Sequence, residues 1–141
     1  MNKKDVIDLK GEGWLYSKIV EDHFFAPRNV MRDGINHKEF NAYGEVGALA
    51  CGDIMKIWLK IENDKIIDFK WKTFGCASAI ASTSILSEMT TGMMIGDAYN
   101  ITANDIIEAL GGLPKRKIHC SILGDQGLRA AIDDYRKSKS N

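Results

Sequence analysis

Residues 55–72 read MKIWLKIENDKIIDFKWK, two runs of alternating apolar and polar side chains separated by a polar turn. The turn is Asn63-Asp64, and Trp58 interrupts the alternation of the first run. The apolar positions of the two runs are Met55, Ile57, Leu59 and Ile61, then Ile67, Phe69 and Trp71. A period of two is typical of strands with one buried face, so this stretch predicts an antiparallel hairpin.

The hairpin is flanked by a further strand and by helices. Residues 40–46 also alternate and predict a strand before the hairpin. Ser17 predicts the N-cap of a short helix through Phe25, and Pro27 prevents its continuation. Beyond Cys76 the period changes, because small or apolar residues recur every fourth position up to Gly92.

Two more helices are predicted near the C-terminus. Thr102 and Asp105 resemble a capping box that opens a short helix ending at Gly111-Gly112. The last helix is predicted from about His119 to Lys137. Strands followed by helices favour an α+β fold, a three-stranded antiparallel sheet with helices packed on one face. We expect a mobile arm over residues 1–15, one domain over 16–137 and a tail over 138–141.

Composition narrows the function classes. Nineteen basic and nineteen acidic residues balance, which gives no support for binding to nucleic acid or to a membrane surface. Neither a signal peptide nor a transmembrane segment is readable. Three cysteines is an odd number, so free or metal-bound thiols in a cytoplasmic setting are expected rather than disulfides.

Four residues form the candidate site: Cys51, Cys76 and the adjacent His119-Cys120. Three thiols and an imidazole make a soft ligand set for one tetrahedral zinc or for the two irons of a small cluster. The cysteines lie before a strand, after a strand and at the start of the last helix, so all three can meet at one end of the sheet. Helix N-termini favour thiolates there.

Asp53 is a fifth candidate. It is two residues from Cys51 and beside Gly52, so it is either a turn carboxylate or a hard oxygen ligand among soft thiolates. A hard oxygen ligand is replaceable, which suits a site that must release what it binds.

Three segments then carry a resemblance to a known family: ACGD at 50–53, TFGCASAIAS at 73–82 and KIHCSIL at 117–123. They resemble the signature segments of iron–sulfur cluster assembly scaffold proteins of the IscU/NifU N-terminal type, here in the stand-alone IscU form. Residues 16–23 and 27–30 are similar to that family's amino-terminal segment. The resemblance spans about residues 16–137 and implies an IscU/SufE-like sandwich.

The resemblance implies a carrier rather than a turnover enzyme. Such a protein accepts persulfide sulfur from a cysteine desulfurase, takes up iron, and uses an electron donor such as ferredoxin. It assembles a [2Fe–2S] cluster and passes it to apo-proteins. Cys51, Cys76 and Cys120 would ligate the cluster, with His119 or Asp53 as the variable fourth ligand. Cys120 would be the principal persulfide acceptor. Zinc in place of a cluster and a homodimer around a shared cluster are left open.

The sequence differs from the family pattern in one segment, and three other functions compete with the cluster scaffold. Lys115-Arg116 replaces a proline and a valine that the family has before its His-Cys pair, which argues against release by a dedicated Hsp70-type chaperone in that form. The first rival is a zinc-dependent persulfide carrier of the SufU type, which has an insertion between its second and third cysteines and lacks the histidine. The others are a structural zinc module and a Cys–His hydrolase, for which His119 beside Cys120 is badly placed.

Overall fold

A computed structural model of the chain describes residues 17–48, 52–113 and 118–139, with the side chains of 48 and 118–122 left aside. In chain order the elements are α2 (Lys18–Phe25), η1 (His37–Glu39), β1 (Ala42–Ala48), β2 (Asp53–Glu62), β3 (Lys65–Phe74), α3 (Ala77–Thr90), α4 (Ile95–Tyr99), α5 (Ala103–Ala109) and α6 (Ile118–Lys139). The strands form one antiparallel sheet in the order β1-β2-β3. The α+β class and the three-stranded antiparallel sheet are therefore confirmed.

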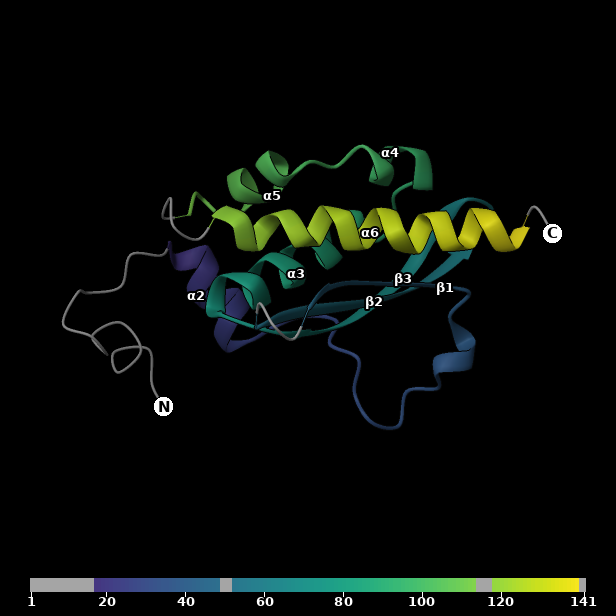
Figure 1. The fold of residues 1–141 in the computed structure, drawn as a ribbon, viewed down its shortest axis with the longest axis horizontal. Coiled ribbons are helices and arrows are strands. Elements are labelled where there is room, and N and C mark those ends of the chain that lie inside the picture. The colour runs from purple at the N-terminus through teal and green to yellow at the C-terminus, as the bar shows by residue number, and fades with distance from the viewer. Residues whose placement is uncertain (1–16, 49–51, 114–117, 140–141) are drawn as a thin grey trace.

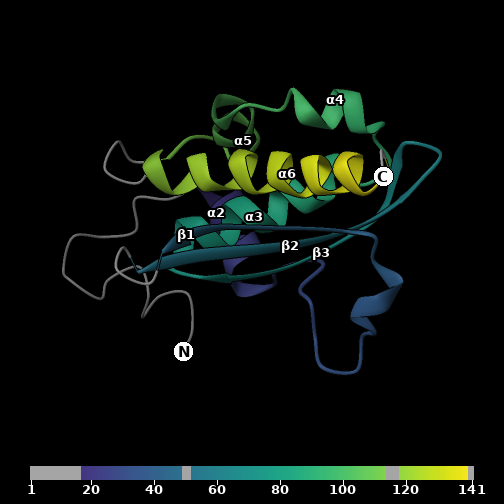
Figure 2. The same ribbon diagram turned by 45° about the vertical axis from the view of Figure 1, so that its right-hand side comes forward.

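The helices cover one face of the sheet. In Figures 1 and 2, α3 and α6 lie over this face, α4 and α5 lie beyond α6, and the segment carrying η1 lies on the opposite side of the sheet. The core between sheet and helices contains the buried side of β2, Leu86 of α3, and Leu128 and Ile132 of α6. Burial of each such aliphatic side chain stabilises the fold by about 1.5–3 kcal/mol.

Helix α6 lies unusually close to β1. A Cβ added at Gly44 would lie 2.6 Å from the backbone nitrogen of Ala131 and from the backbone oxygen of Gly127. Real Cβ atoms do not approach backbone so closely, so a glycine is required on β1 at this point. The contact sets the height of α6, the helix whose first turn contains His119 and Cys120, above the sheet.

Two predicted helix caps are confirmed. The hydroxyl of Ser17 accepts a hydrogen bond from the backbone N–H of Val20 at 3.1 Å. Thr102 and Asp105 form a reciprocal capping box at the start of α5. Each cap satisfies backbone donors that have no partner inside the helix, which is worth roughly 1 kcal/mol.

The predicted burial of Ile67 is wrong. Ile66 is fully buried, whereas Ile67 is 38% exposed. The pairing explains the error, because Ile61 pairs with Ile66 and Lys60 pairs with Asp68, which leaves Ile67 without an opposite residue. Ile67 is thus the extra residue of a β-bulge, and a bulge reverses the alternation of inward and outward side chains.

Three further differences concern element boundaries. The short helix α4 (Ile95–Tyr99) was not predicted, and neither was the short helix η1 (His37–Glu39). Helix α6 continues to Lys139, so residues 138–139 belong to the helix rather than to the expected tail. The expected N-terminal arm lies outside the described residues. None of the helices in the described ranges has the length and hydropathy that a membrane span requires.

Candidate metal centre

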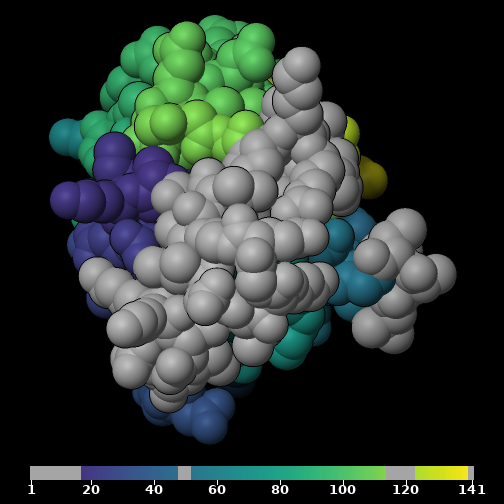
Figure 3. Space-filling model, turned by 90° about the vertical axis from the view of Figure 1, so that its left-hand side faces the viewer, coloured from purple at the N-terminus to yellow at the C-terminus, as the bar shows by residue number. Residues whose placement is uncertain are grey.

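The ends of several strands and helices meet at one end of the sheet. Ala48, the last residue of β1, pairs with Asp53, the first residue of β2, and Ile54 pairs with Phe74, the last residue of β3. Figures 1 and 2 show the first turns of α3 and α6 at this same end, and Figure 3 views the molecule from that direction with α2 in purple at the rim. The elements that carry the predicted site residues therefore converge.

The structure describes the five predicted site residues to different extents. Asp53 and Cys76 are described in full, and the backbone of His119 and Cys120 lies in the first turn of α6. Cys51 and the side chains of His119 and Cys120 fall outside the described residues. Within the described part of the chain, no group of three His, Cys, Asp or Glu side chains could hold a metal ion. The ligand set accordingly stays a prediction.

Cys76 is the N-cap residue of α3. Its backbone is extended, with φ −77° and ψ 172°, and its side chain makes no capping hydrogen bond. Its Sγ lies 3.0 Å from the hydroxyl of the fully buried Ser78 in the first turn. The unpaired N–H groups of that turn and the helix dipole stabilise negative charge on sulfur. The sequence reasoning missed Ser78, although a Cys-x-Ser at a helix start is a readable signal.

A contact between two hydroxyl groups joins the middle of α3 to the end of β3. The side-chain oxygens of Thr73 and Thr83 lie 2.9 Å apart. Thr83 itself donates to the carbonyl oxygen of Ala79, and Ser82 donates in the same way to Ser78. These bonds satisfy buried hydroxyl groups inside a helix whose sides are nearly all buried. They restrict movement of the turn that carries Cys76.

The carboxylate of Asp53 lies against Gly75. A Cβ added at Gly75 would overlap Asp53 Oδ1 and would lie 3.3 Å from the Cβ of Ala79. Gly52, in contrast, has φ +78°, so its glycine serves the turn itself. Among the described residues, Asp53 accepts no hydrogen bond that would make it a turn-stabilising carboxylate. Its side chain instead lies beside the residue that precedes Cys76.

Comparison with known proteins decides the family. The family model for the NifU-like N-terminal domain matches residues 15–141. The chain belongs to this family.

Named relatives agree with that assignment. The NifU-like chain is 47% identical over 121 residues to "Iron-sulfur cluster assembly scaffold protein IscU 1" of Archaeoglobus fulgidus, covering 86% of this chain and 76% of that protein. It is 45% identical over 128 residues to the IscU scaffold protein of Rickettsia prowazekii, covering 89% and 95%. The match to the nitrogen fixation protein NifU of Trichormus azollae, 44% identical, covers 87% of this chain and 42% of that protein, so the chain spans less than half of that relative.

Solved structures share the fold. The N-terminal part of a nitrogen-fixing NifU-like protein from Brucella abortus superposes with a TM-score of 0.70 at 14% identity, covering 86% of this chain and 94% of that chain. A SUF-system iron–sulfur cluster assembly scaffold protein from Fervidobacterium islandicum AW-1 gives a TM-score of 0.62 at 22% identity, covering 83% and 96%. At these identities the likeness concerns the fold alone.

A buried histidine joins α2 to α3 in this NifU-like chain. His23 is 5% exposed, its Nδ1 lies 2.7 Å from the hydroxyl of Ser84, and its Nε2 lies 3.4 Å from Glu88. Burial and then the positive charge of Arg28 lower the pKa of His23, against the opposing effects of Glu88 and Asp22. The neutral imidazole is therefore the form that the packed α2–α3 contact favours.

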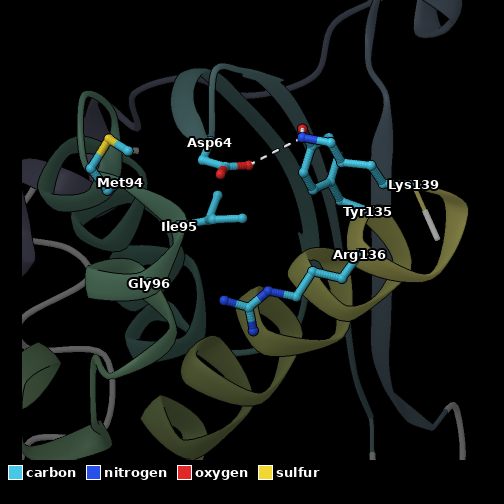
Figure 4. Close-up of a pocket in the computed structure, with 7 residues that line it drawn as sticks. All are labelled: Asp64, Met94, Ile95, Gly96, Tyr135, Arg136 and Lys139. Atoms are coloured by element: carbon cyan, nitrogen blue, oxygen red, sulfur yellow. Dashed lines mark hydrogen bonds and ion pairs between the residues drawn. The ribbon is translucent and has the colours of Figure 1, made fainter.

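A pocket of about 660 Å³ lies at the other end of the sheet. Figure 4 shows its wall, formed by the turn at Asp64, the start of α4 and the last turns of α6. Lys139 and Asp64 form an exposed ion pair at 3.6 Å there. The ten residues of β2 separate this pocket from Asp53 by roughly 30 Å, so it is not part of the candidate metal centre.

Proposed function

We propose that this chain is a scaffold on which an iron–sulfur cluster, specifically [2Fe–2S], is assembled and from which it is handed to apo-proteins. Family membership supports this proposal, because relatives at 47% and 45% identity carry the name of cluster assembly scaffold. The observation that supports it in this molecule is the contact of the Asp53 carboxylate with Gly75, the residue that precedes Cys76 at the start of α3.

The proposed ligands are the three thiolates of Cys51, Cys76 and Cys120, with Asp53 or His119 completing the set. Soft thiolates bind iron strongly, whereas a carboxylate oxygen is the harder and more readily replaced ligand. The cluster is cargo here, so a site with one weak ligand can both hold it and let it go. The half-buried position of Asp53 admits water to the same place.

Sulfur arrives in this proposal by persulfide exchange. The Cys120 thiolate attacks the outer sulfur of a desulfurase persulfide, a new S–S bond forms, and the desulfurase cysteine leaves as a thiolate. Release of that sulfur as sulfide takes two electrons, which a donor such as ferredoxin supplies. The backbone of α6 begins at Ile118, so Cys120 sits in the first turn, where the dipole favours its thiolate.

A zinc-dependent persulfide carrier of the SufU type is the second candidate. The fold is compatible with it, because a SUF-system scaffold protein superposes with a TM-score of 0.62. His119 and the lack of an insertion between Cys76 and Cys120 favour the cluster scaffold. A structural zinc module is disfavoured, since structural sites are closed, whereas the carboxylate of Asp53 is half-buried beside Gly75, the neighbour of Cys76.

Anaerobic reconstitution with iron, cysteine and a cysteine desulfurase tests the proposal. We expect visible absorption of a [2Fe–2S] cluster in the wild-type chain and no stable cluster in Cys51→Ser, Cys76→Ser or Cys120→Ser. A matched control moves a thiol instead of deleting it. Ser138→Cys in the Cys76→Ser background restores the thiol count about 30 Å away on α6, so it should not restore the cluster. A chain that binds zinc but forms no cluster contradicts the proposal.

A further inference from the structure

Among the described residues, the outer edge of β3 has no backbone partner next to Cys76. On the side away from β2, the N–H of Trp71 donates to the carbonyl oxygen of Asn29 at 3.2 Å, and the N–H of Met31 donates to the carbonyl oxygen of Trp71 at 2.7 Å. Backbone groups alternate sides along a strand, so the N–H and C=O of Thr73 point to the same edge as those of Trp71. In the described ranges nothing forms a backbone hydrogen bond with Thr73 on that edge.

An apolar groove of about 370 Å³ runs along this edge. It is lined by Pro27, Val30, Trp71, Lys72, Thr73, Phe74 and Ile80. Phe74 is 58% exposed, the largest exposed fraction among the described large apolar residues, and it is two positions before Cys76. Ile80 belongs to the first turns of α3, the helix that Cys76 caps. The groove therefore leads directly to the proposed cluster site.

The charge beside the groove is positive. Lys72 lines the groove and pairs directly with Lys56 across the β2–β3 ladder. Like charges at directly opposite positions repel each other. Lys56 also faces Glu45 on β1, but that carboxylate accepts a hydrogen bond from the Tyr43 hydroxyl at 2.6 Å. No carboxylate of the described residues forms an ion pair with either lysine. A negatively charged group at the groove would relieve this repulsion.

We propose that the Thr73 edge of β3 binds an extended, acidic and apolar segment of the protein that receives the cluster. The segment pairs with β3 as an additional strand. Its backbone C=O accepts a hydrogen bond from the Thr73 N–H, its backbone N–H donates to the Thr73 C=O, its apolar side chains cover Phe74, and a carboxylate pairs with Lys72. The proposal rests on the scaffold function, because a segment held there brings the recipient's own ligands to Cys76.

Substitutions at Thr73 separate the edge from the rest of the strand. Thr73→Pro removes the outward N–H without removing a β2–β3 hydrogen bond, which an edge strand tolerates. Thr73→Val is the matched control, since it keeps the N–H and loses the hydroxyl contact with Thr83. With an acidic plant-type apo-ferredoxin as the probe, we expect Thr73→Pro to slow cluster transfer about fivefold to tenfold relative to Thr73→Val.

Charge reversal gives an independent arm of the same experiment. Lys72→Glu should slow transfer at low salt, and the difference should shrink as salt screens the charges. Lys65→Glu reverses a charge at the hairpin end of the same strand and should leave transfer unchanged. Equal transfer rates in Thr73→Pro and Thr73→Val, or an equal effect of the two lysine reversals, overturn the proposal.

Amide exchange tests the docking without any cluster. We expect the Thr73 amide of the cluster-free chain to exchange quickly alone and more slowly with the same apo-ferredoxin bound. Failure of the wild-type chain to take up a cluster refutes the scaffold function, whereas unchanged exchange at Thr73 in the complex refutes the docking. Two other results also refute the docking proposal. If the Thr73 amide of the free chain is protected and the protection disappears when residues 1–12 are removed, the chain's own N-terminal segment occupies the edge. If the protection grows with chain concentration, a second copy of the chain occupies it.

Discussion

Replacing Gly75 by alanine should reproduce the effect of removing the Asp53 carboxylate. The added Cβ would overlap Asp53 Oδ1, which is the far end of a flexible side chain, so the carboxylate moves rather than the backbone. The oxygen has to shift by roughly 1 Å to reach van der Waals contact, a displacement that a small change in its χ angles supplies at about 1 kcal/mol. The variant should therefore fold, with a melting temperature a few degrees lower.

The functional consequence follows from the role proposed for Asp53. If the carboxylate weakens cluster retention by offering a replaceable oxygen ligand and a wet environment, displacing it leaves a drier site with more sulfur. We expect the [2Fe–2S] cluster of Gly75→Ala and of Asp53→Ala to persist severalfold longer in air and to transfer more slowly to an apo-ferredoxin. The double variant should resemble either single variant, because both changes remove the same interaction.

The assay is the decay of visible absorption in air, with wild type and variants measured side by side. Gly96→Ala is a matched control, since a Cβ there meets no atom within 4 Å and lies at the far end of the molecule. Faster decay in Gly75→Ala, with Asp53→Ala decaying more slowly, would show that the glycine shapes the Cys76 turn. Faster decay in both variants would assign Asp53 to stabilising the loop and refute its role in release.

Three further predictions concern sulfur, pH and the sheet. After incubation with a cysteine desulfurase and cysteine, peptide mass spectrometry should find added sulfur mainly on the peptide containing Cys120; sulfur mainly on another cysteine contradicts this. Burial and a nearby guanidinium lower the pKa of His23 below 6.5, so the unfolded chain binds the proton more readily than the folded one. The contribution of neutral His23 to the free energy of unfolding should therefore be complete above pH 6.5. It should be lost as the pH falls from there through the folded-state pKa. His23→Gln should flatten that decline in denaturant titrations and His37→Gln should not. Deletion of Ile67 should change the free energy of unfolding by about 1 kcal/mol or less, because it removes the bulge and keeps every residue pair between β2 and β3. Deletion of Lys70 should cost several kcal/mol, because it moves the residues after it to the opposite face of the sheet.

Local patterns predicted most of the elements. The capping box at Thr102 and the cap at Ser17 depend on side chains within three residues of the helix start, so sequence alone reveals them. Helix α4 was missed because its start depends on a distant segment. The N–H of Ile95 donates to the carbonyl oxygen of Asp64 at 2.8 Å, and Met94 forms a bridge with Lys65. No periodic pattern of five residues contains that information.

The sequence predicts a set of candidate site residues, but it does not predict the contacts between them. Chain order indicates that Cys51, Cys76 and Cys120 stand at element ends, and those ends converge in the fold. The contact of Asp53 with Gly75 depends instead on the register between β2 and β3. A shift of one residue would remove it, and register is a property of two strands and their turn together.

In the β2–β3 hairpin, the pairing set by the turn and the pairing required by the apolar pattern differ by one residue. Asn63 and Asp64 have φ of +54° and +61°, the conformation of a two-residue hairpin turn, so Glu62 pairs with Lys65. Continued without interruption, that pairing would place Phe69 opposite the outward-facing Trp58 and remove it from the core. The apolar pattern requires Phe69 inside, and it is fully buried. A bulge between the turn and Phe69 is the arrangement that satisfies both signals.

The same bulge decides what lies opposite Asp53. Without it, the regular pairing set by the turn would bring Phe74 opposite Asp53, and a large side chain would take the place of the carboxylate. With one extra residue on β3, Ile54 pairs with Phe74, and the next residue, Gly75, lies against the side chain of Asp53. Gly75 has no side chain to exclude the carboxylate, which can therefore lie beside the turn that carries Cys76. The geometry of the proposed site thus follows from the turn and the core pattern imposed together, about ten residues away from the cysteine.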